Sequence, residues 1–154
     1  MRKSARRLAV VAFVALVFLT LRAQTDRDVV VAQTGQSITV TRIYTGPDGQ
    51  SHAEELQMKL NGRSSELMKA TGVQFSRTPA GNFSDWHVGP RRQYVITLSG
   101  RGEIEVAGGK KISMGPGHIN LIEDLTGKGH TTRVVGTEDR ITVAIPLADQ
   151  SVSR

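Results

Sequence analysis

The chain has 154 residues, of which 20 are basic and 14 acidic, with four histidines and no cysteine. One globular domain is expected at this length, and the lack of cysteine excludes both a disulfide scaffold and a thiolate zinc site. Five basic and no acidic residues lie in the first 23 positions, which leaves 15 basic against 14 acidic residues in the remainder. This near-neutral remainder lacks the clustered charge that nucleic-acid binding requires, and we expect no nucleic-acid partner.

The N-terminal segment has the pattern of a secretory signal. Residues 1–7 are rich in basic side chains and precede an apolar run of 14 residues, Leu8–Leu21. As a helix this run spans about 21 Å, less than the ~30 Å hydrocarbon core, which favours a signal peptide over a membrane span. A signal peptide over residues 1–23 predicts an extracytoplasmic protein, periplasmic or secreted, with the membrane as a partner only if the segment stays uncleaved. Residues 24–36 then form a tether and residues 149–154 a C-terminal tail.

Short segments rich in β-branched and aromatic residues follow one another through residues 37–148, separated by Gly, Pro, Asn or Asp. The predicted strands cover residues 37–44, 52–60, 73–77, 83–88, 93–98, 103–107, 111–114, 119–123, 131–135 and 141–145. The best helix candidate spans residues 64–72, with Ser64 as its cap and Gly72 as its end, and has only about two turns. This pattern predicts one all-β domain over residues 37–148, an antiparallel sandwich or barrel with at most one short helix.

Side chains suited to chemistry gather in two parts of this domain. Trp86, His87, Gln93 and Tyr94 lie close together in the sequence, and a polar stretch runs from Glu123 to His130. On a strand, His87 and Gly89 would share one face, because side chains alternate with period two.

The first of these groups resembles the first motif of the cupin superfamily, in which His-x-His is followed by Glu and then by Gly. His87 stands at the first histidine, Gly89 at the second, Gln93 at the glutamate and Gly100 at the closing glycine. If this alignment holds, Gly89→His would place a new imidazole inside the barrel and tighten the binding of Ni or Zn.

The second group resembles the end of the second cupin motif, Pro-x-Gly-x-x-His. Gly127 and His130 keep the glycine and the histidine, and the proline is lost. More narrowly, residues 86–94 and 123–130 look like a group of small single-domain bacterial cupins of unassigned activity. The resemblance covers residues 83–148 firmly and 37–60 loosely.

The resemblance implies an antiparallel jelly-roll β-barrel with its site inside. Typical metal cupins use three His and one Glu, whereas this sequence offers His87, Gln93 and His130 as metal ligands. The implied cofactor is a divalent metal, and these ligand types suit Fe, Mn, Ni or Zn without choosing among them. Each residue also has a structural interpretation: His87 could hydrogen-bond at a packed barrel mouth, and Gln93 could bond a neighbouring strand.

Two functions therefore stay open for an exported cupin-like protein. The first is a metal-dependent enzyme that acts on a small organic substrate by oxygenation, isomerisation or lyase chemistry. The alternative is a metal-free binding module that uses the same pocket for a small polar ligand. In either case Trp86, Tyr94 and Glu123 are the candidate ligand-binding residues, the partner is a small molecule, and a homodimer is a further expectation.

Overall fold

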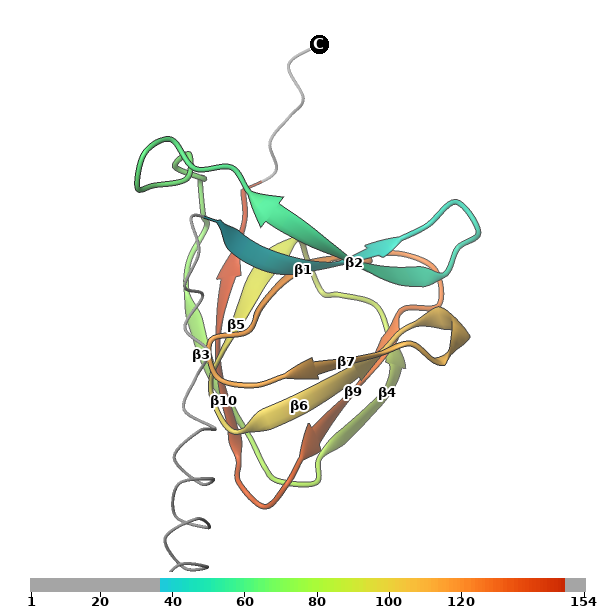
Figure 1. Cartoon of the computed structure of the whole chain (residues 1–154). Coiled ribbons are helices and arrows are strands. Elements are labelled where there is room, and N and C mark those ends of the chain that lie inside the picture. Colours follow the sequence, from blue (N-terminus) through green and yellow to red (C-terminus); the bar gives the residue numbers. More distant parts are fainter. Residues whose placement is uncertain (1–36, 149–154) are drawn as a thin grey trace, which may run out of the picture. The chain divides into compact units, whose positions relative to one another are not determined.

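The computed structural model describes residues 37–148, so the expected signal segment, tether and C-terminal tail lie outside the described residues. Within this range the chain forms strands joined by connections that are short except for residues 59–73 (Figure 1). Their bounds are β1 Ile38–Thr45, β2 Ser51–Met58, β3 Gln74–Thr78, β4 Phe83–His87, β5 Gln93–Ser99, β6 Arg101–Glu105, β7 Lys111–Met114, β8 Ile119–Glu123, β9 His130–Val135 and β10 Arg140–Pro146. Each strand that the sequence predicts is present with slightly shifted ends, which confirms the all-β fold class.

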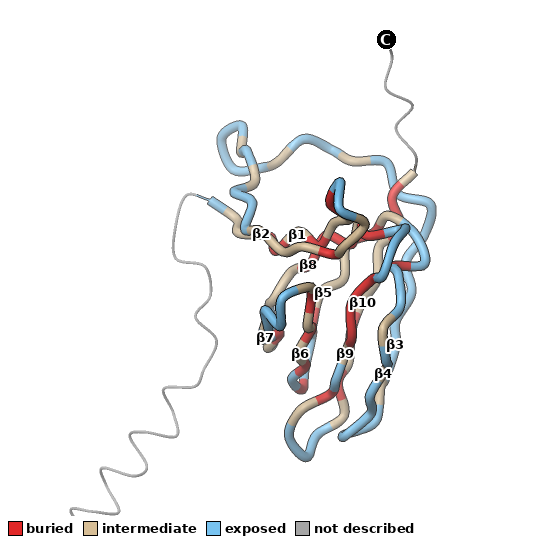
Figure 2. Tube along the Cα trace, turned by 90° about the vertical axis from the view of Figure 1, so that its right-hand side faces the viewer, coloured by how far each residue is buried: buried red, intermediate tan, exposed pale blue. Residues whose placement is uncertain are grey.

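The strands form two sheets in a jelly-roll arrangement. One sheet has the order β2-β1-β8-β5-β10-β3 and the other the order β4-β9-β6-β7. The pairings within the described range are antiparallel except that of β1 with β8, which is parallel and which the sequence did not predict. Burial concentrates in β1, β8, β6, β9 and β10, whereas β3 and β4 are largely exposed (Figure 2). The two sheets are not hydrogen-bonded to each other into a closed barrel.

Side-chain alternation divides the core between the two faces of the six-stranded sheet. The cluster between the sheets comprises Ile43, Ile104, Val106, Met114 and Ile122. A second cluster comprises Val40, Leu121 and Leu147. Because neighbouring residues of a strand point to opposite faces, Leu121 and Ile122 of β8 serve one cluster each. In β5, Gln93 pairs with Ile122 and Tyr94 with Leu121, so the same alternation separates these two candidate site residues.

The helix predicted for residues 64–72 is wrong. This segment is an irregular connection, and the described range contains helical structure only as a 3₁₀ turn at Ala107–Gly109. Leu67, the large apolar residue at its centre, is 98% exposed, so no packing offsets the cost of starting a helix of two turns. Backbone hydrogen bonds tie the segment to the end of β10 instead, from Thr71 N to Pro146 O and from Ala148 N to Lys69 O.

The described residues contain no helix that is long and apolar enough to cross a membrane.

Candidate functional site

Two histidines far apart in the sequence meet across a pair of neighbouring strands. His87 ends β4 and His130 begins β9, and the two are register partners in the four-stranded sheet. Their ring centroids lie 4.6 Å apart, with the ring planes tilted by 55°. The four-stranded sheet therefore brings together the two imidazoles that the motif resemblance singled out.

A buried carboxylate orients the His130 ring. His130 is 4% exposed, and its Nδ1 lies 2.6 Å from Oδ2 of Asp124, which is fully buried. Ser51 Oγ donates a second hydrogen bond of 2.7 Å to the same oxygen. In the sequence, Asp124 is one residue of the polar stretch from Glu123 to His130, with no role assigned to it. Side-chain alternation continued one residue past the end of β8 turns Asp124 toward the interior when Glu123 faces out.

The His87 ring is fixed by the backbone rather than by a carboxylate. Its Nδ1 donates a hydrogen bond of 2.7 Å to the carbonyl oxygen of Asp85. His87 is exposed, in contrast to His130. Neither Nε2 atom has a partner among the described residues, because the recorded contacts of both rings are made through Nδ1. Both imidazoles therefore keep one ring nitrogen for a ligand.

Two glycines allow the close approach of the segments that carry these histidines. Gly129 has a φ of 77°, and a Cβ at this position would overlap the carbonyl oxygen of His87. Gly89 donates a backbone hydrogen bond of 2.9 Å to Asp124 O. Gly89 lies just beyond the end of β4 and lines the same cavity as His87. A Cβ on Gly89 would overlap Ile122 Cγ2, so a histidine placed there would have to displace Ile122.

A cavity of about 120 Å³ lies between the sheets and is lined by both histidines. Gln93, which is 9% exposed, also lines it, and its side-chain amide has no hydrogen-bond partner among the described residues. Much of the remaining wall is apolar and comprises Val95, Ile104, Met114 and Ile122. The three candidate metal ligands thus share one cavity. Within residues 37–148, however, no group of three or more His, Cys, Asp or Glu side chains is placed to hold a metal ion.

A buried arginine, Arg140, lines the same cavity, and the sequence analysis did not single it out. It is 7% exposed, and its Nε and Nη2 donate hydrogen bonds of 3.2 and 2.8 Å to Thr97 Oγ1. Burial lowers the pKa of Arg140. The predicted strand begins at residue 141 and so leaves Arg140 out. In the structure β10 begins at Arg140 in the inward register: Arg140 and Thr142 are both buried, and Ile141 between them is less so.

Trp86, a candidate ligand-binding residue, does not line this cavity. It lines a separate pocket with Glu103 and Arg133 on the opposite face of the four-stranded sheet, and Lys128 Nζ lies 3.9 Å from the centre of its ring.

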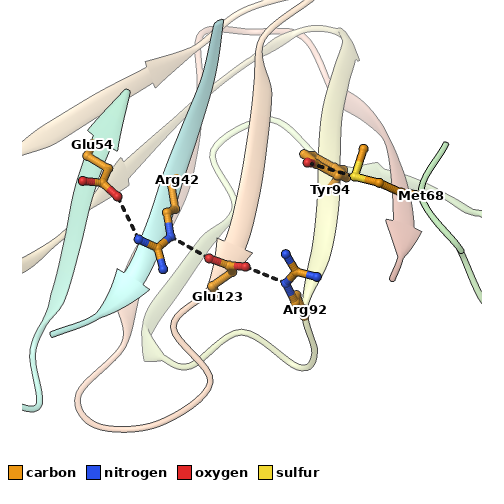
Figure 3. Close-up of polar contacts among 6 residues, drawn as sticks. All are labelled: Arg42, Glu54, Met68, Arg92, Tyr94 and Glu123. Atoms are coloured by element: carbon orange, nitrogen blue, oxygen red, sulfur yellow. Dashed lines mark hydrogen bonds and ion pairs between the residues drawn. The ribbon is translucent and has the colours of Figure 1, made fainter. Parts of the chain in front are cut away.

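Glu123 and Tyr94 also lie apart from the cavity, on the other face of the six-stranded sheet (Figure 3). Glu123 accepts hydrogen bonds from Arg42 Nε at 2.6 Å and from Arg92 Nε at 2.5 Å. Burial alone would raise the pKa of Glu123, but the hydrogen bonds and charges of the two arginines outweigh it and lower this pKa. The Glu123 carboxylate is therefore part of an ion-pair network with Arg42 and Arg92.

Tyr94 lines a separate pocket of about 430 Å³ between the six-stranded sheet and the connection that follows β2. Its hydroxyl donates a long hydrogen bond of 3.5 Å to Met68 Sδ, and burial raises its pKa. Strand parity turns Tyr94 away from Gln93. The three candidate ligand-binding residues and the three candidate metal ligands therefore belong to different surfaces.

Comparison with known proteins finds similarity at the level of solved structures. No family model and no curated protein matches the chain. Matching structures include an RmlC-like cupin protein from Desulfovibrio desulfuricans, with 15% identity and a TM-score of 0.37, covering 77% of this chain and 90% of that one. A cupin protein from Bacteroides fragilis has 22% identity and a TM-score of 0.38, covering 53% and 69%. The cupin domain of Cnp3 from Schizosaccharomyces pombe has 13% identity and a TM-score of 0.38, covering 76% and 88%.

These similarities carry no information about activity. The two sheets, their strand order and the position of the motif histidines come from the chain itself. The chain has two sheets in a jelly-roll arrangement, with His87 and His130 paired across β4 and β9.

Proposed function

We propose that this domain holds a divalent transition-metal ion in its interior cavity and acts there on a small organic molecule. The ligands are Nε2 of His87, Nε2 of His130 and the amide oxygen of Gln93. The observation that supports the proposal is the pair of imidazoles 4.6 Å apart, each with Nδ1 engaged and Nε2 without a partner among the described residues.

The surroundings of both rings fit metal ligation. A ligating histidine usually donates its other ring N–H to a carboxylate or a backbone carbonyl, which fixes the tautomer and raises the basicity of the ligating nitrogen. Asp124 does this for His130, and the carbonyl of Asp85 does it for His87. Because Asp124 Oδ2 also accepts from Ser51, the His130 ring has a well-defined orientation.

Gln93 is the weakest of the three ligands. Its amide oxygen is neutral, so the site lacks the carboxylate that would offset the charge of the ion, and we expect weaker binding than at a site with Glu in this place. Imidazole and amide donors suit Fe, Mn, Ni and Zn alike. A metal held by three protein ligands keeps open positions and acts as a Lewis acid toward a bound oxygen atom.

The cavity itself supplies binding and the exclusion of water. Its volume of about 120 Å³ is below the usual range for drug-sized ligands, which restricts the substrate to a few non-hydrogen atoms. The exposed His87 marks the side from which such a molecule enters.

The second candidate function is metal-free binding of a small polar molecule in the same cavity. The observation that favours it is that the described residues provide two imidazoles and no carboxylate toward a metal, so that no set of three His, Cys, Asp or Glu is formed. The unpaired amide of Gln93 would then serve as a hydrogen-bonding group for the ligand rather than for an ion.

Calorimetric titration of the metal-depleted full chain with Ni²⁺ and Zn²⁺ decides between these functions. We expect one ion per wild-type chain and the loss of binding in His87→Ala and in His130→Ala. His52→Ala is the matched control, because His52 is bonded to Asp48 outside the cavity, and it should bind as the wild type does. Absence of binding to the wild type, or unchanged binding in both cavity variants, would support the metal-free module.

We further propose export, on the basis of the basic N-terminal residues and the apolar run Leu8–Leu21. Cell fractionation should find a chain shortened by its first 23 residues or so outside the cytoplasm. A full-length chain in the soluble cytoplasmic fraction would contradict this part of the proposal.

A further inference from the structure

Arg140 is a buried cation without an acidic partner. It is 7% exposed, and no Asp or Glu of the described range lies within ion-pair distance of its guanidinium. Its recorded partners are Thr97 Oγ1 and Met114 Sδ, both of them neutral. Charged side chains are rarely this buried unless they are paired, because removal from water is costly. A buried, unpaired guanidinium therefore requires an explanation.

The hydrogen bonds of this guanidinium leave part of its donor capacity unused. Arginine has five N–H donors, and those that are bonded here belong to Nε and Nη2. Nη1 has no partner among the described residues. Nη1 is also not fully buried. Among the described residues, Asp124 Oδ1 is the one fully buried side-chain polar atom that lacks a hydrogen-bond partner. Nη1 thus keeps accessible surface, on a residue that lines the interior cavity.

The chain makes room for Arg140 at the wall of the cavity. A Cβ on Gly102 of β6 would lie 3.0 Å from Cδ and 3.1 Å from Nε of Arg140, so glycine at this position admits the side chain. Thr97 of β5 holds the guanidinium through two hydrogen bonds, which fixes its orientation. The space beside Gly102 and the hydrogen bonds to Thr97 therefore hold the Arg140 side chain in a defined orientation.

The cavity that Arg140 lines has no acidic residue in its wall, whose polar members are His87, Gln93, Asn120, His130, Thr132 and Arg140. Its fixed charge is therefore positive. The guanidinium fork is the side chain best matched to a carboxylate, to which it can donate two parallel hydrogen bonds. The cavity volume of about 120 Å³ is that of about four water molecules in the liquid, so the ligand has only a few non-hydrogen atoms.

We propose that the cavity binds a small organic carboxylate, with Arg140 receiving the carboxylate group and the rest of the molecule extending along the apolar wall toward His87 and His130. This names the substrate class of the proposed function and rests on it in taking the cavity as the site of action. Arg140 would remain a carboxylate-binding residue in the metal-free case as well, because its contacts do not include the candidate metal ligands.

The test uses acetate, glycolate and pyruvate as probes, each paired with its uncharged amide, and follows binding to the full chain by NMR titration in the presence of EDTA. We expect at least one of the acids to bind about tenfold more tightly than its amide, because the amide lacks the charge that the guanidinium pairs with. Equal binding of every acid and its amide, or no binding of any acid, would overturn the inference.

Two variants and a control locate the effect. Arg140→Met should lose the preference for the acid, whereas Arg101→Met removes the same charge from an exposed position of the other sheet and should preserve it. If Arg140→Met fails to fold, Arg140→Lys serves instead: it keeps the charge, loses the fork, and should bind the acids several-fold more weakly. Unchanged acid binding in a folded Arg140 variant would overturn the inference.

The outcome is separable from that of the metal titration. Carboxylate binding is measured with metal ions chelated, so its failure beside intact metal binding overturns this inference alone. Failure of metal binding with intact carboxylate binding overturns the proposed metal site alone.

Discussion

His87 and His130 are neighbours in space but differ in what their removal would leave behind. His87 is exposed and bonded to a backbone carbonyl at a strand end, where water can replace the ring. His130 is buried against Asp124, so its loss would leave a fully buried carboxylate with Ser51 as its remaining hydrogen-bond donor. The two residues should therefore contribute very differently to stability although both serve the proposed site.

We predict that His130→Ala lowers the free energy of unfolding by about 2 kcal/mol, the usual cost of leaving a buried polar group without its hydrogen-bond partner. His87→Ala should cost less than about 0.5 kcal/mol, as is typical of exposed positions. Urea unfolding of both variants without metal measures the difference. Equal costs would mean that Asp124 finds another partner when His130 is absent.

Glu123 gives a second prediction at the scale of one residue. Its pKa is lower in the folded chain than its usual value near 4.5, because hydrogen bonds from Arg92 and Arg42 outweigh the opposing effect of burial. As the pH falls, the unfolded chain therefore takes up this proton before the folded chain does. The stabilisation by Glu123 is complete above the usual pKa and is lost as the pH falls through the lowered one.

Glu123→Gln should remove this part of the acid sensitivity. We expect the variant to lose about 1 kcal/mol of stability at pH 7 and to show a shallower decline between about pH 5 and pH 3. Urea unfolding across this range supplies the measurement. A decline as steep as that of the wild type would show that other carboxylates dominate acid unfolding.

His87, Gln93 and His130, which the motif spacing grouped together, line one cavity in the structure, and their role as metal ligands stays a prediction. The sequence did not identify the contributions of Asp124 and Arg140. Both depend on which face of a strand a residue occupies, and the residue type alone misleads there: a carboxylate beside a loop and an arginine at a strand start both suggest solvent exposure. Their burial follows from tertiary contacts with Ser51 and Thr97 that lie far away in the chain.

At the scale of elements, the alternation of side chains between the two faces of a strand was the most reliable signal of which residues share a site. The sequence analysis did not apply it to every candidate residue. Alternation separates Tyr94 from Gln93, and Trp86 likewise lies on the face of β4 opposite to His87. The grouping of Trp86 with His87 came from their adjacency in sequence, and adjacency on a strand means opposite faces. The helix predicted for residues 64–72 is wrong for a related reason. Its capping residues can be read from the local sequence, whereas the packing that stabilises a short helix depends on residues elsewhere in the chain.

The connection before β9 provides a prediction at this scale, because Gly129 permits its contact with the end of β4. Gly129→Ala should cost about 1–2 kcal/mol for the left-handed backbone and more for the overlap with the carbonyl of His87. It should also weaken metal binding by separating His87 from His130. Gly81→Ala is the control, because Gly81 has a similar φ of 74° and no neighbouring atom within 4 Å of the added Cβ.

Both glycine variants are compared by thermal unfolding and by Ni²⁺ titration. The difference between them isolates the overlap, since both carry the same backbone strain. If Gly129→Ala behaves like Gly81→Ala in both measurements, the contact with His87 is not needed to position the histidines.

At the scale of the whole domain, the six-stranded sheet separates two cavities of different character. The pocket on its outer face is larger, at about 430 Å³, and includes acidic and basic residues, Glu66, Lys69 and Arg92 among them. The cavity between the sheets is smaller and carries the imidazoles, the unpaired amide of Gln93 and the buried guanidinium. Volume alone would select the outer pocket, whereas the available ring nitrogens and the unpaired charge select the inner one.

The central claim is that Nε2 of both His87 and His130 binds one metal ion while Nδ1 of each keeps its present partner. Long-range ¹H–¹⁵N NMR of the ¹⁵N-labelled chain reports each ring nitrogen separately during titration with Zn²⁺. The account predicts that the Nε2 signals of His87 and His130 shift together, with both Nδ1 atoms still protonated and His52 unaffected. Unshifted signals of both rings at saturating Zn²⁺, or a shift of only one of them, would contradict it.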